Sequence, residues 1–233
     1  MFDRTFQRSA CARRTTGVTL DHAAALYDWL APVMTLGMET RLHRQVVAAM
    51  DLDRPMAVLD IGCGTGSLTR LIADAMPAGG GWTIGIDAAE KMIDVARRKA
   101  GSRSLQFEAA LAEDLPYPPA SFDRAVSTFF FHHLDVRLKT RAIAEIQRVL
   151  RPGGRAHILD VDIPTTRFGS FCAHAGYHLF RQPEIMENIN GMLRLVIATS
   201  GFKDSWRIVS RHAGYLSLYE LTVPSDKPEG VKS

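Results

Sequence analysis

Apolar and polar positions along the middle of the chain predict strands and helices in regular alternation. Val58, Leu59 and Ile61 form a short apolar run of the kind found in a strand buried on both faces. Ser67 to Met76 then carries apolar residues at helical spacing. The same reading predicts further strands over 82–87, 104–109, 122–128 and 155–162, and further helices over 88–100 and 137–150. This order predicts a Rossmann-like, doubly wound, mostly parallel sheet with helices on both faces.

The two ends of the chain complete this outline. After 163–182 we expect a helix over about 183–200, then strands over 202–209 and 215–223 that would bring the sheet to seven strands. Before the first strand we expect helices from about 21 to 30 and from about 35 to 50. Residues 1–17 are polar and basic without an apolar period, which predicts a mobile arm. Residues 18–233 are then expected to form one domain.

A glycine-rich loop follows the first predicted strand. Gly62, Gly64 and Gly66 let the turn be tight and let the backbone approach a ligand closely. The spacing G-x-G-x-G puts Ser67 where a dinucleotide fingerprint has its third glycine. Asp60, at the strand end, would repel a pyrophosphate but suits a cationic amino-acid group. The loop therefore favours a nucleoside ligand that carries a cationic amino-acid group over a dinucleotide.

An acidic residue also ends the second predicted strand. Asp87 lies about 20 residues beyond the glycine loop, where the two hydroxyls of an adenosine ribose can donate to one carboxylate. This position suits either a dinucleotide or another adenosine cofactor. The alternative is an exposed cap of the following helix.

Composition and charge narrow the classes of function. The formal charge is +3, and the arm 1–17 with four arginines and one aspartate accounts for all of it, so a folded basic face for nucleic acid is disfavoured. Cys11, Cys63 and Cys172 are widely spaced and odd in number, which fits a reducing cytoplasm and not a disulfide framework or a metal knuckle. No apolar run is long enough to span a membrane, and no signal peptide is expected.

Two motifs carry a family resemblance. The segment Val58 to Gly66 and the turn "RVL-x-PGG" at 148–154 resemble those of class I S-adenosylmethionine-dependent methyltransferases, close to the ubiquinone and menaquinone biosynthesis group. The resemblance runs from about Tyr27 to Tyr219 and weakens after Ile163. It implies S-adenosylmethionine as the cofactor, with the methionine part held by the glycine loop, and it gives the PGG turn a structural role.

The resemblance also implies a set of cofactor-binding residues. Tyr27 would belong to an N-terminal helical lid over the cofactor. The full set is Tyr27, Asp60, Gly62, Cys63, Gly64, Gly66, Asp87, Ala88, Met92, Leu111, Ala112, Thr128 and Phe129. The family usually has an aspartate at 111 to hold the adenine amino group, and this chain has leucine there. Leu111 can pack on the purine and the Ala112 backbone can read its edge, while Glu113 and Asp114 are expected to be solvated or capping.

The chemistry implied is in-line transfer of the methyl group to a small-molecule acceptor, with no metal required. His132 and His133 follow the fourth strand and are the candidates for a general base, with packing as the alternative role. His174, Tyr177 and His178 lie in the segment 163–182, which we expect to cover the acceptor together with the N-terminal helices. Aromatic residues can line a pocket for a quinone-like ring or a lipid: Phe129, Phe130, Phe131, Phe168, Phe171, Tyr177 and Phe180.

Two alternatives remain from the sequence. A cofactor-binding protein without catalysis is suggested by Leu111 alone. An NAD-dependent oxidoreductase is disfavoured by Ser67 and by the PGG turn. Peripheral contact with a membrane surface through the basic arm is a further option, and the oligomeric state is left open.

Overall fold

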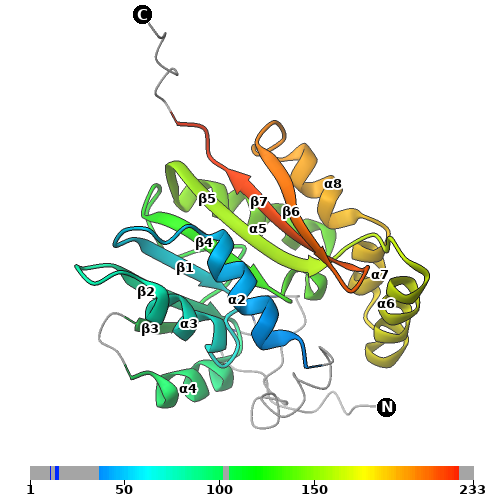
Figure 1. Cartoon of the computed structure of the whole chain (residues 1–233), viewed down its shortest axis with the longest axis horizontal. Helices are drawn as coiled ribbons and strands as arrows, with labels where there is room; N and C mark the ends of the chain where they lie inside the picture. The colour runs from blue at the N-terminus through cyan, green and yellow to red at the C-terminus, as the bar shows by residue number, and fades with distance from the viewer. Residues whose placement is uncertain (1–10, 12–13, 16–36, 102–104, 226–233) are drawn as a thin grey trace, which may run out of the picture.

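A computed structural model describes residues 11, 14–15, 37–101 and 105–225 (Figure 1). Within these residues the sheet has the strand order β3-β2-β1-β4-β5-β7-β6. β7 runs antiparallel to its neighbours β5 and β6, and the other neighbouring pairs are parallel. The strands are β1 (Ala57–Ile61), β2 (Trp82–Asp87), β3 (Leu105–Ala109), β4 (Phe122–Thr128), β5 (Leu150–Val161), β6 (Trp206–His212) and β7 (Leu216–Thr222).

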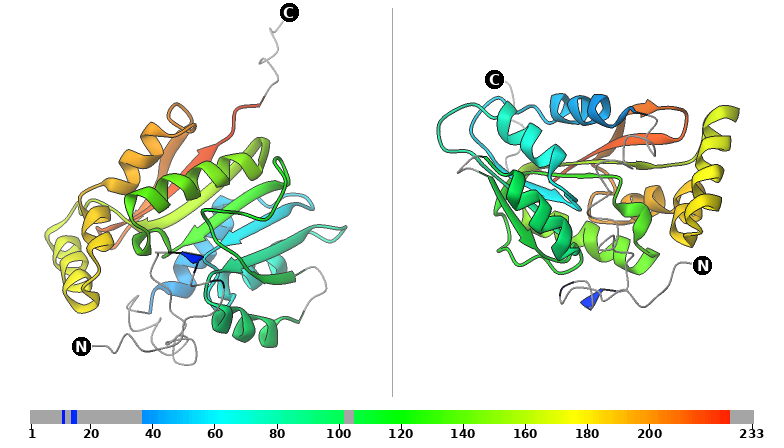
Figure 2. Two further views of the ribbon diagram at one scale, coloured as in Figure 1. Left: turned by 180° about the vertical axis from the view of Figure 1, so that it is seen from behind. Right: turned by 90° about the horizontal axis from the view of Figure 1, so that it is seen from below.

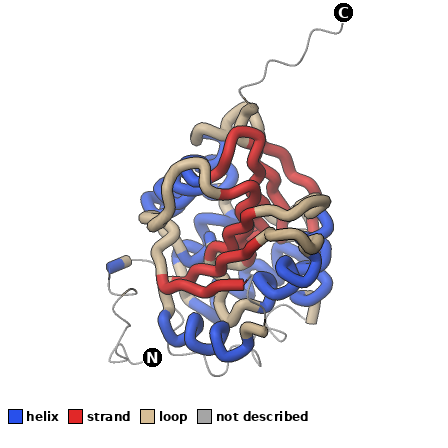
Figure 3. Tube along the Cα trace, turned by 90° about the vertical axis from the view of Figure 1, so that its left-hand side faces the viewer, coloured by secondary structure: helices blue, strands red, loops and turns tan. Residues whose placement is uncertain are grey.

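Helices cover both faces of this sheet (Figures 2 and 3). α2 and α3 pack on one face around Val58, Val126 and Leu159. α5 and α8 pack on the other. The helices are α2 (Glu39–Ala49), α3 (Ser67–Ala75), α4 (Glu90–Lys99), α5 (Val136–Val149), α6 (Arg167–Phe180), α7 (Pro183–Ile189) and α8 (Met192–Thr199), with a 3₁₀ turn η2 (Phe131–His133). The doubly wound α/β sheet predicted from the sequence is confirmed.

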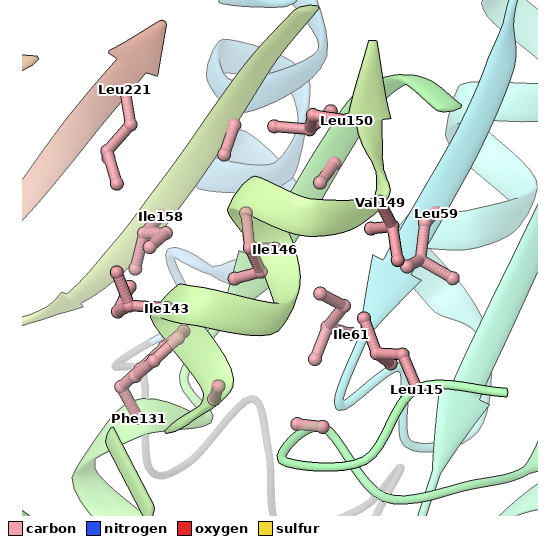
Figure 4. Close-up of a cluster of buried hydrophobic side chains, with 14 of the residues drawn as sticks. Leu59, Ile61, Leu115, Phe131, Ile143, Ile146, Val149, Leu150, Ile158 and Leu221 are labelled. Carbon is pink, nitrogen blue, oxygen red and sulfur yellow. The ribbon is translucent and has the colours of Figure 1, made fainter. Parts of the chain in front are cut away.

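The largest core cluster explains why the central strands are almost continuously apolar. Leu59 and Ile61 of β1 lie in one cluster with Ile143, Ile146 and Val149 of α5 (Figure 4). The other side of β1 is covered by α2 and α3, so all five of its residues are buried. Burial on both faces selects a run of apolar residues in place of alternation. β6, at the edge, alternates between half-buried and exposed residues instead.

The strand order reverses between β1 and β4. β2 pairs with one edge of β1, and β4 pairs with the opposite edge of β1. At such a point the loops leave the sheet in opposite directions and open a crevice at the carboxyl ends of the strands, where α/β proteins bind their ligands.

Several boundaries differ from the sequence prediction for identifiable reasons. The helix expected over 183–200 is two helices, because Gly191 takes a φ of +85° and caps α8. Leu150 already pairs with Phe122, so β5 includes the PGG turn that was expected to precede it. The helix expected before residue 35, the Tyr27 lid and most of the arm 1–17 lie outside the described residues.

The segment 163–182 holds an amphipathic helix, α6, with aromatic residues on its outer face. Phe168 and Phe171 are 61% and 72% exposed, whereas Phe131 is fully buried in the core. In the described part of the chain these rings therefore do not surround a common cavity, and the aromatic pocket expected from all of them is wrong in that form. None of the described helices is long and apolar enough to cross a membrane.

We expect Gly66→Ala to destabilise the domain by about 2–5 kcal/mol. Gly66 has a φ of +78°, and a Cβ there would lie 2.4 Å from Cζ of Phe107. Urea denaturation measures the change in the free energy of unfolding. Gly101→Ala is the matched control, because a Cβ at Gly101 meets no atom within 4 Å. Equal stability of the two variants would contradict the packing described.

Candidate functional site

Two cavities meet at the carboxyl ends of β1, β2 and β4. The first is lined by Asp87, Ala88, Ala112, Glu113 and Phe130, among others; we call it the Asp87 cavity. The second is lined by Asp60, the glycine loop and Thr128; we call it the Asp60 cavity. Gly62 lines both. The sites expected for an adenosine and for an amino-acid group are thus adjacent.

The glycine loop has the backbone that its sequence predicts. Gly62, Gly64 and Gly66 have φ angles of +72°, +53° and +78°. The N–H groups of Gly62 and Cys63 both donate to the carbonyl of Ile86 at 2.9 Å, which ties the loop to β2. Residues with a side chain rarely adopt such backbone φ angles, so these positions favour glycine.

Asp87 is fixed by the loop it faces. One carboxylate oxygen accepts from the N–H of Gly64 at 3.0 Å, and the other accepts from the N–H of Ala89 at 2.8 Å. A carboxylate can accept about four hydrogen bonds, which suits it to a ligand that donates through two hydroxyls. The carboxylate lines the cavity, and a ribose with two adjacent hydroxyls fits this donor and acceptor pattern.

Asp60 is buried beside the glycine loop. It is 1% exposed and accepts a hydrogen bond from the hydroxyl of Thr69 at 2.7 Å. Burial and the nearby charge of Asp87 raise its pKa to about 7, against the opposite effect of Thr69. A cationic ligand group in the Asp60 cavity would restore the ionised form. The residues thus fit the ammonium end of an amino-acid ligand.

We expect binding of S-adenosylhomocysteine to tighten about tenfold between pH 6 and pH 8, as Asp60 ionises. Of the other groups at this cavity, His43 has its pKa lowered to about 4 and the pKa of the Cys63 thiol is raised, so both stay neutral in this window. Glu39 also lines the cavity, so Asp60→Asn is the control that isolates Asp60.

Calorimetry at the two pH values gives the dissociation constants, and a pH slope that survives in Asp60→Asn would contradict the assignment. The same ionisation acts oppositely on folding. Because the folded pKa of Asp60 is raised, the free energy of unfolding should fall as pH rises from about 4 to 7.

Two residues of α2 complete the Asp60 cavity and were missed from the sequence. His43 is 5% exposed, and its Nε2 lies 3.4 Å from the hydroxyl of Thr128. Glu39 lines the cavity one turn earlier. The signal was a histidine within the apolar face formed by Leu42 and Val46. Helical periodicity alone could not distinguish it from a buried structural residue.

The end of β4 adopts a strained conformation at this cavity. Phe129 has a φ of +53°, while its N–H donates to the carbonyl of Leu159 at 2.9 Å. A left-handed aromatic residue costs about 1–3 kcal/mol and is typically found at functional sites. Thr128 and Phe129 both line the cavity, where the sequence placed them.

His132 forms a buried pair with Asp160. Its Nδ1 lies 2.8 Å from a carboxylate oxygen of Asp160, which is itself 0% exposed. The N–H groups of Phe130 and Phe131 donate to the other oxygen at 3.0 and 2.8 Å. Burial opposes ionisation of Asp160, but the interaction with His132 and the hydrogen bond from the N–H of Val161 hold its pKa below the usual value. Nδ1–H therefore points at Asp160, and Nε2 is left to accept a proton.

His133 is in a different environment. Its Nδ1 lies 2.9 Å from Oε1 of Gln182, and its ring centroid is 4.1 Å from that of His132. Burial and the charge of His132 lower its pKa to about 3. A group that holds a proton so weakly is a poor general base near neutral pH. Of the two candidates, the environment favours His132.

The remaining predicted residues divide into two groups. Cys63 and Gly64 line the Asp60 cavity, and Ala88 and Ala112 line the Asp87 cavity. Met92, 1% exposed, and Leu111, 6% exposed, are buried and line neither. Gly66 caps α3. Their roles, and that of Tyr27 outside the described residues, remain predictions. No cluster of metal-ligating side chains is found among the described residues.

This fold and site define the class of α/β proteins that bind an adenosyl amino-acid cofactor at the end of the first strands. The comparisons with known proteins agree: residues 58–154 match the family model described as a methyltransferase domain. The resemblance to class I S-adenosylmethionine-dependent methyltransferases is therefore confirmed. Family and fold imply S-adenosylmethionine as the cofactor.

Two curated relatives are similar to the greater part of this chain. The demethylmenaquinone methyltransferase of Symbiobacterium thermophilum is 36% identical over 65% of this chain and 61% of its own length. The ubiquinone/menaquinone biosynthesis C-methyltransferase of Geobacter sp. strain M21 is 34% identical over 61% of each chain. The match thus spans about 60% of the length of these relatives. A methyltransferase structure from Aquifex aeolicus aligns with a TM-score of 0.57 at 19% identity, over 78% of this chain and 89% of its own.

Proposed function

We propose that this chain is an S-adenosylmethionine-dependent methyltransferase acting on a small, quinone-like acceptor. The observation that carries the proposal is the meeting of Asp60, the glycine loop and Asp87 at one crevice of the sheet. The acceptor class is supported by the names of the relatives, which are methyltransferases of demethylmenaquinone and of ubiquinone or menaquinone biosynthesis.

The chain's own residues would bind the two ends of the cofactor separately. Asp87 accepts from the ribose hydroxyls, and Asp60 faces the ammonium group. The bound cofactor supplies a methyl group that is already activated on a sulfonium. Holding the acceptor in line with that methyl group can provide up to about 7–11 kcal/mol of the barrier, and excluding water preserves this alignment.

His132 is the residue proposed to take the acceptor's proton. Asp160 holds its Nδ1–H, so Nε2 carries the lone pair that removes the proton. Asp160 also stabilises the imidazolium that results, because its carboxylate stays ionised. The acceptor loses one proton to His132 and gains one methyl group, and the imidazolium later returns the proton to water. A base so placed contributes about 10²–10⁴-fold to a rate.

The cellular setting and domain limits belong to the same proposal. The thiols of Cys11, Cys63 and Cys172 are free, which supports a reducing cytoplasm. We treat 18–233 as one domain and 1–17 as a basic arm. Of that arm the structure describes Cys11, Arg14 and Thr15, and Arg14 forms an ion pair with Asp114 at 3.2 Å. Nucleic acid is not expected as a partner.

The direct test is methyl transfer to a short-chain demethylmenaquinol, kept reduced and incubated with S-adenosylmethionine. We expect mass spectrometry to show the methylated quinol and S-adenosylhomocysteine in equal amounts, and less of both from Asp87→Ala at a cofactor concentration below its dissociation constant. Binding of S-adenosylhomocysteine without product from this quinol or from a panel of phenols and amines would instead favour a cofactor-binding protein without catalysis. Binding of a nicotinamide cofactor would contradict the proposal.

A further inference from the structure

The Asp87 cavity contains a second carboxylate that the sequence assigned to solvent. Glu113 is 7% exposed and lines the cavity together with Asp87. Asp87 stands at the end of β2, and Glu113 follows β3, the neighbouring strand. The lining also includes the small apolar residues Ala88, Ala110 and Ala112. The cavity thus has two acidic residues in its lining, one from the end of β2 and one from the turn after β3.

A tight turn puts Glu113 in this position. Leu111 and Asp114 pair as an isolated bridge, and the N–H of Asp114 donates to the carbonyl of Leu111 at 3.3 Å. Ala112 and Glu113 are therefore the two residues at the tip, and both line the cavity. Leu111 is buried and lines no part of it. The turn therefore brings Glu113, and not Leu111, to the lining of the cavity.

Glu113 is held in place through both its side chain and its backbone. The hydroxyl of Thr15, 8% exposed, donates to its Oε1 at 2.5 Å. The guanidinium of Arg141 donates to the backbone carbonyl of Glu113 at 3.1 Å. Two residues near Thr15 make further contacts with the domain. The guanidinium of Arg14 donates to the carboxylate of Asp114, and the N–H of Cys11 donates to the carboxylate of Glu90 on α4. Thr15 itself lines the cavity beside Glu113.

We propose that Glu113 accepts the hydrogen bond of the adenine 6-amino group and that Thr15 positions its carboxylate. The inference rests on the proposed function, because it takes S-adenosylmethionine as the ligand. A carboxylate only accepts, and the amino group of adenine only donates, so the pair is matched. The carboxylate of Asp87 is likewise an acceptor, and the ribose hydroxyls can donate to it. Base and sugar would then each be read by one acidic residue.

The proposal predicts a preference among nucleobases. Hypoxanthine differs from adenine by a carbonyl oxygen in place of the amino group, so it presents an acceptor to the Glu113 carboxylate. A site built to hydrogen-bond one group discriminates strongly against an analogue that leaves its buried partner unpaired. We expect wild type to bind S-adenosylhomocysteine roughly 10- to 100-fold more tightly than S-inosylhomocysteine.

The test is calorimetry of both nucleosides on wild type, Glu113→Gln and Asp114→Asn. A side-chain amide at position 113 can present either its oxygen or its amino group, so Glu113→Gln should bring the ratio of the two dissociation constants close to one. Asp114→Asn is the matched control, because Asp114 is the adjacent acid but its side chain is 62% exposed and outside the cavity. It should keep the wild-type ratio. A ratio measured on one variant is independent of its folded fraction.

Each other outcome separates the two proposals. If wild type prefers adenine and Glu113→Gln keeps that preference, the amino group is read elsewhere and the inference fails. If wild type binds both nucleosides equally, the inference fails while the proposed cofactor stands. If wild type binds neither, the proposed function fails as well. Thr15→Val should lower the ratio less than Glu113→Gln, as expected of a positioning residue.

Discussion

His132→Asn should lower kcat for methylation of the quinol by about 10²–10⁴-fold. The variant removes the nitrogen that accepts the acceptor's proton, and the contacts of the cofactor cavities are left in place. Affinity for S-adenosylhomocysteine should therefore stay within about twofold of wild type, since binding and proton transfer use different residues. Single-turnover methyl transfer and calorimetry measure the two quantities separately.

His133→Asn is the matched control for this prediction. The two rings are neighbours, but His133 contacts Gln182 and has its pKa lowered to about 3. Its loss should change kcat by less than about tenfold, because a base of that strength contributes little near neutral pH. Equal losses in the two variants would assign both rings to packing. An unchanged rate in His132→Asn would remove the base altogether.

Asp87→Ala should weaken binding of S-adenosylhomocysteine by roughly 1.5–3 kcal/mol, or about 10- to 150-fold in Kd. The variant loses the charge-assisted bonds to the ribose and leaves the N–H of Gly64 and of Ala89 without their carboxylate partner. Calorimetry at one pH gives the change directly.

Asp94→Ala on the surface of α4 provides the comparison. Its carboxylate is 59% exposed and lies 3.9 Å from Arg97, so its removal should alter binding by less than about 0.5 kcal/mol. The ribose assignment would be wrong if the Asp87 and Asp94 variants had the same affinity as wild type.

The part of the site that lies on regular strands was predictable from the sequence. Asp60, Gly62 and Asp87 each follow a buried apolar run, and parallel strands bring their carboxyl ends to one edge. The order of these elements therefore fixed their proximity without knowledge of any side-chain contact. The doubly wound fold followed from the same alternation.

The part of the site that depends on tertiary contacts could not be predicted from the sequence. Glu113 looked like a solvated or capping residue, because its hydrogen-bond partner Thr15 lies 98 positions earlier in the chain. The pairing of His132 with Asp160 joins β5 to the turn after β4 across 28 residues. His43 faces the cavity only because α2 packs over β1. Local sequence patterns do not indicate such long-range partners. The sequence therefore predicted the residues at the strand ends but not the residues that contact them.

The contact between the glycine loop and Phe107 also bears on how such a domain can change over time. Added Cβ atoms at Gly66 and at Gly85 would lie 2.4 and 2.8 Å from the same Phe107 ring. Substitutions at the three positions are thus not independent: a smaller residue at 107 would have to arise before either glycine could be replaced. Phe107 on β3, which lines neither cavity, therefore limits which substitutions these glycines tolerate during evolution.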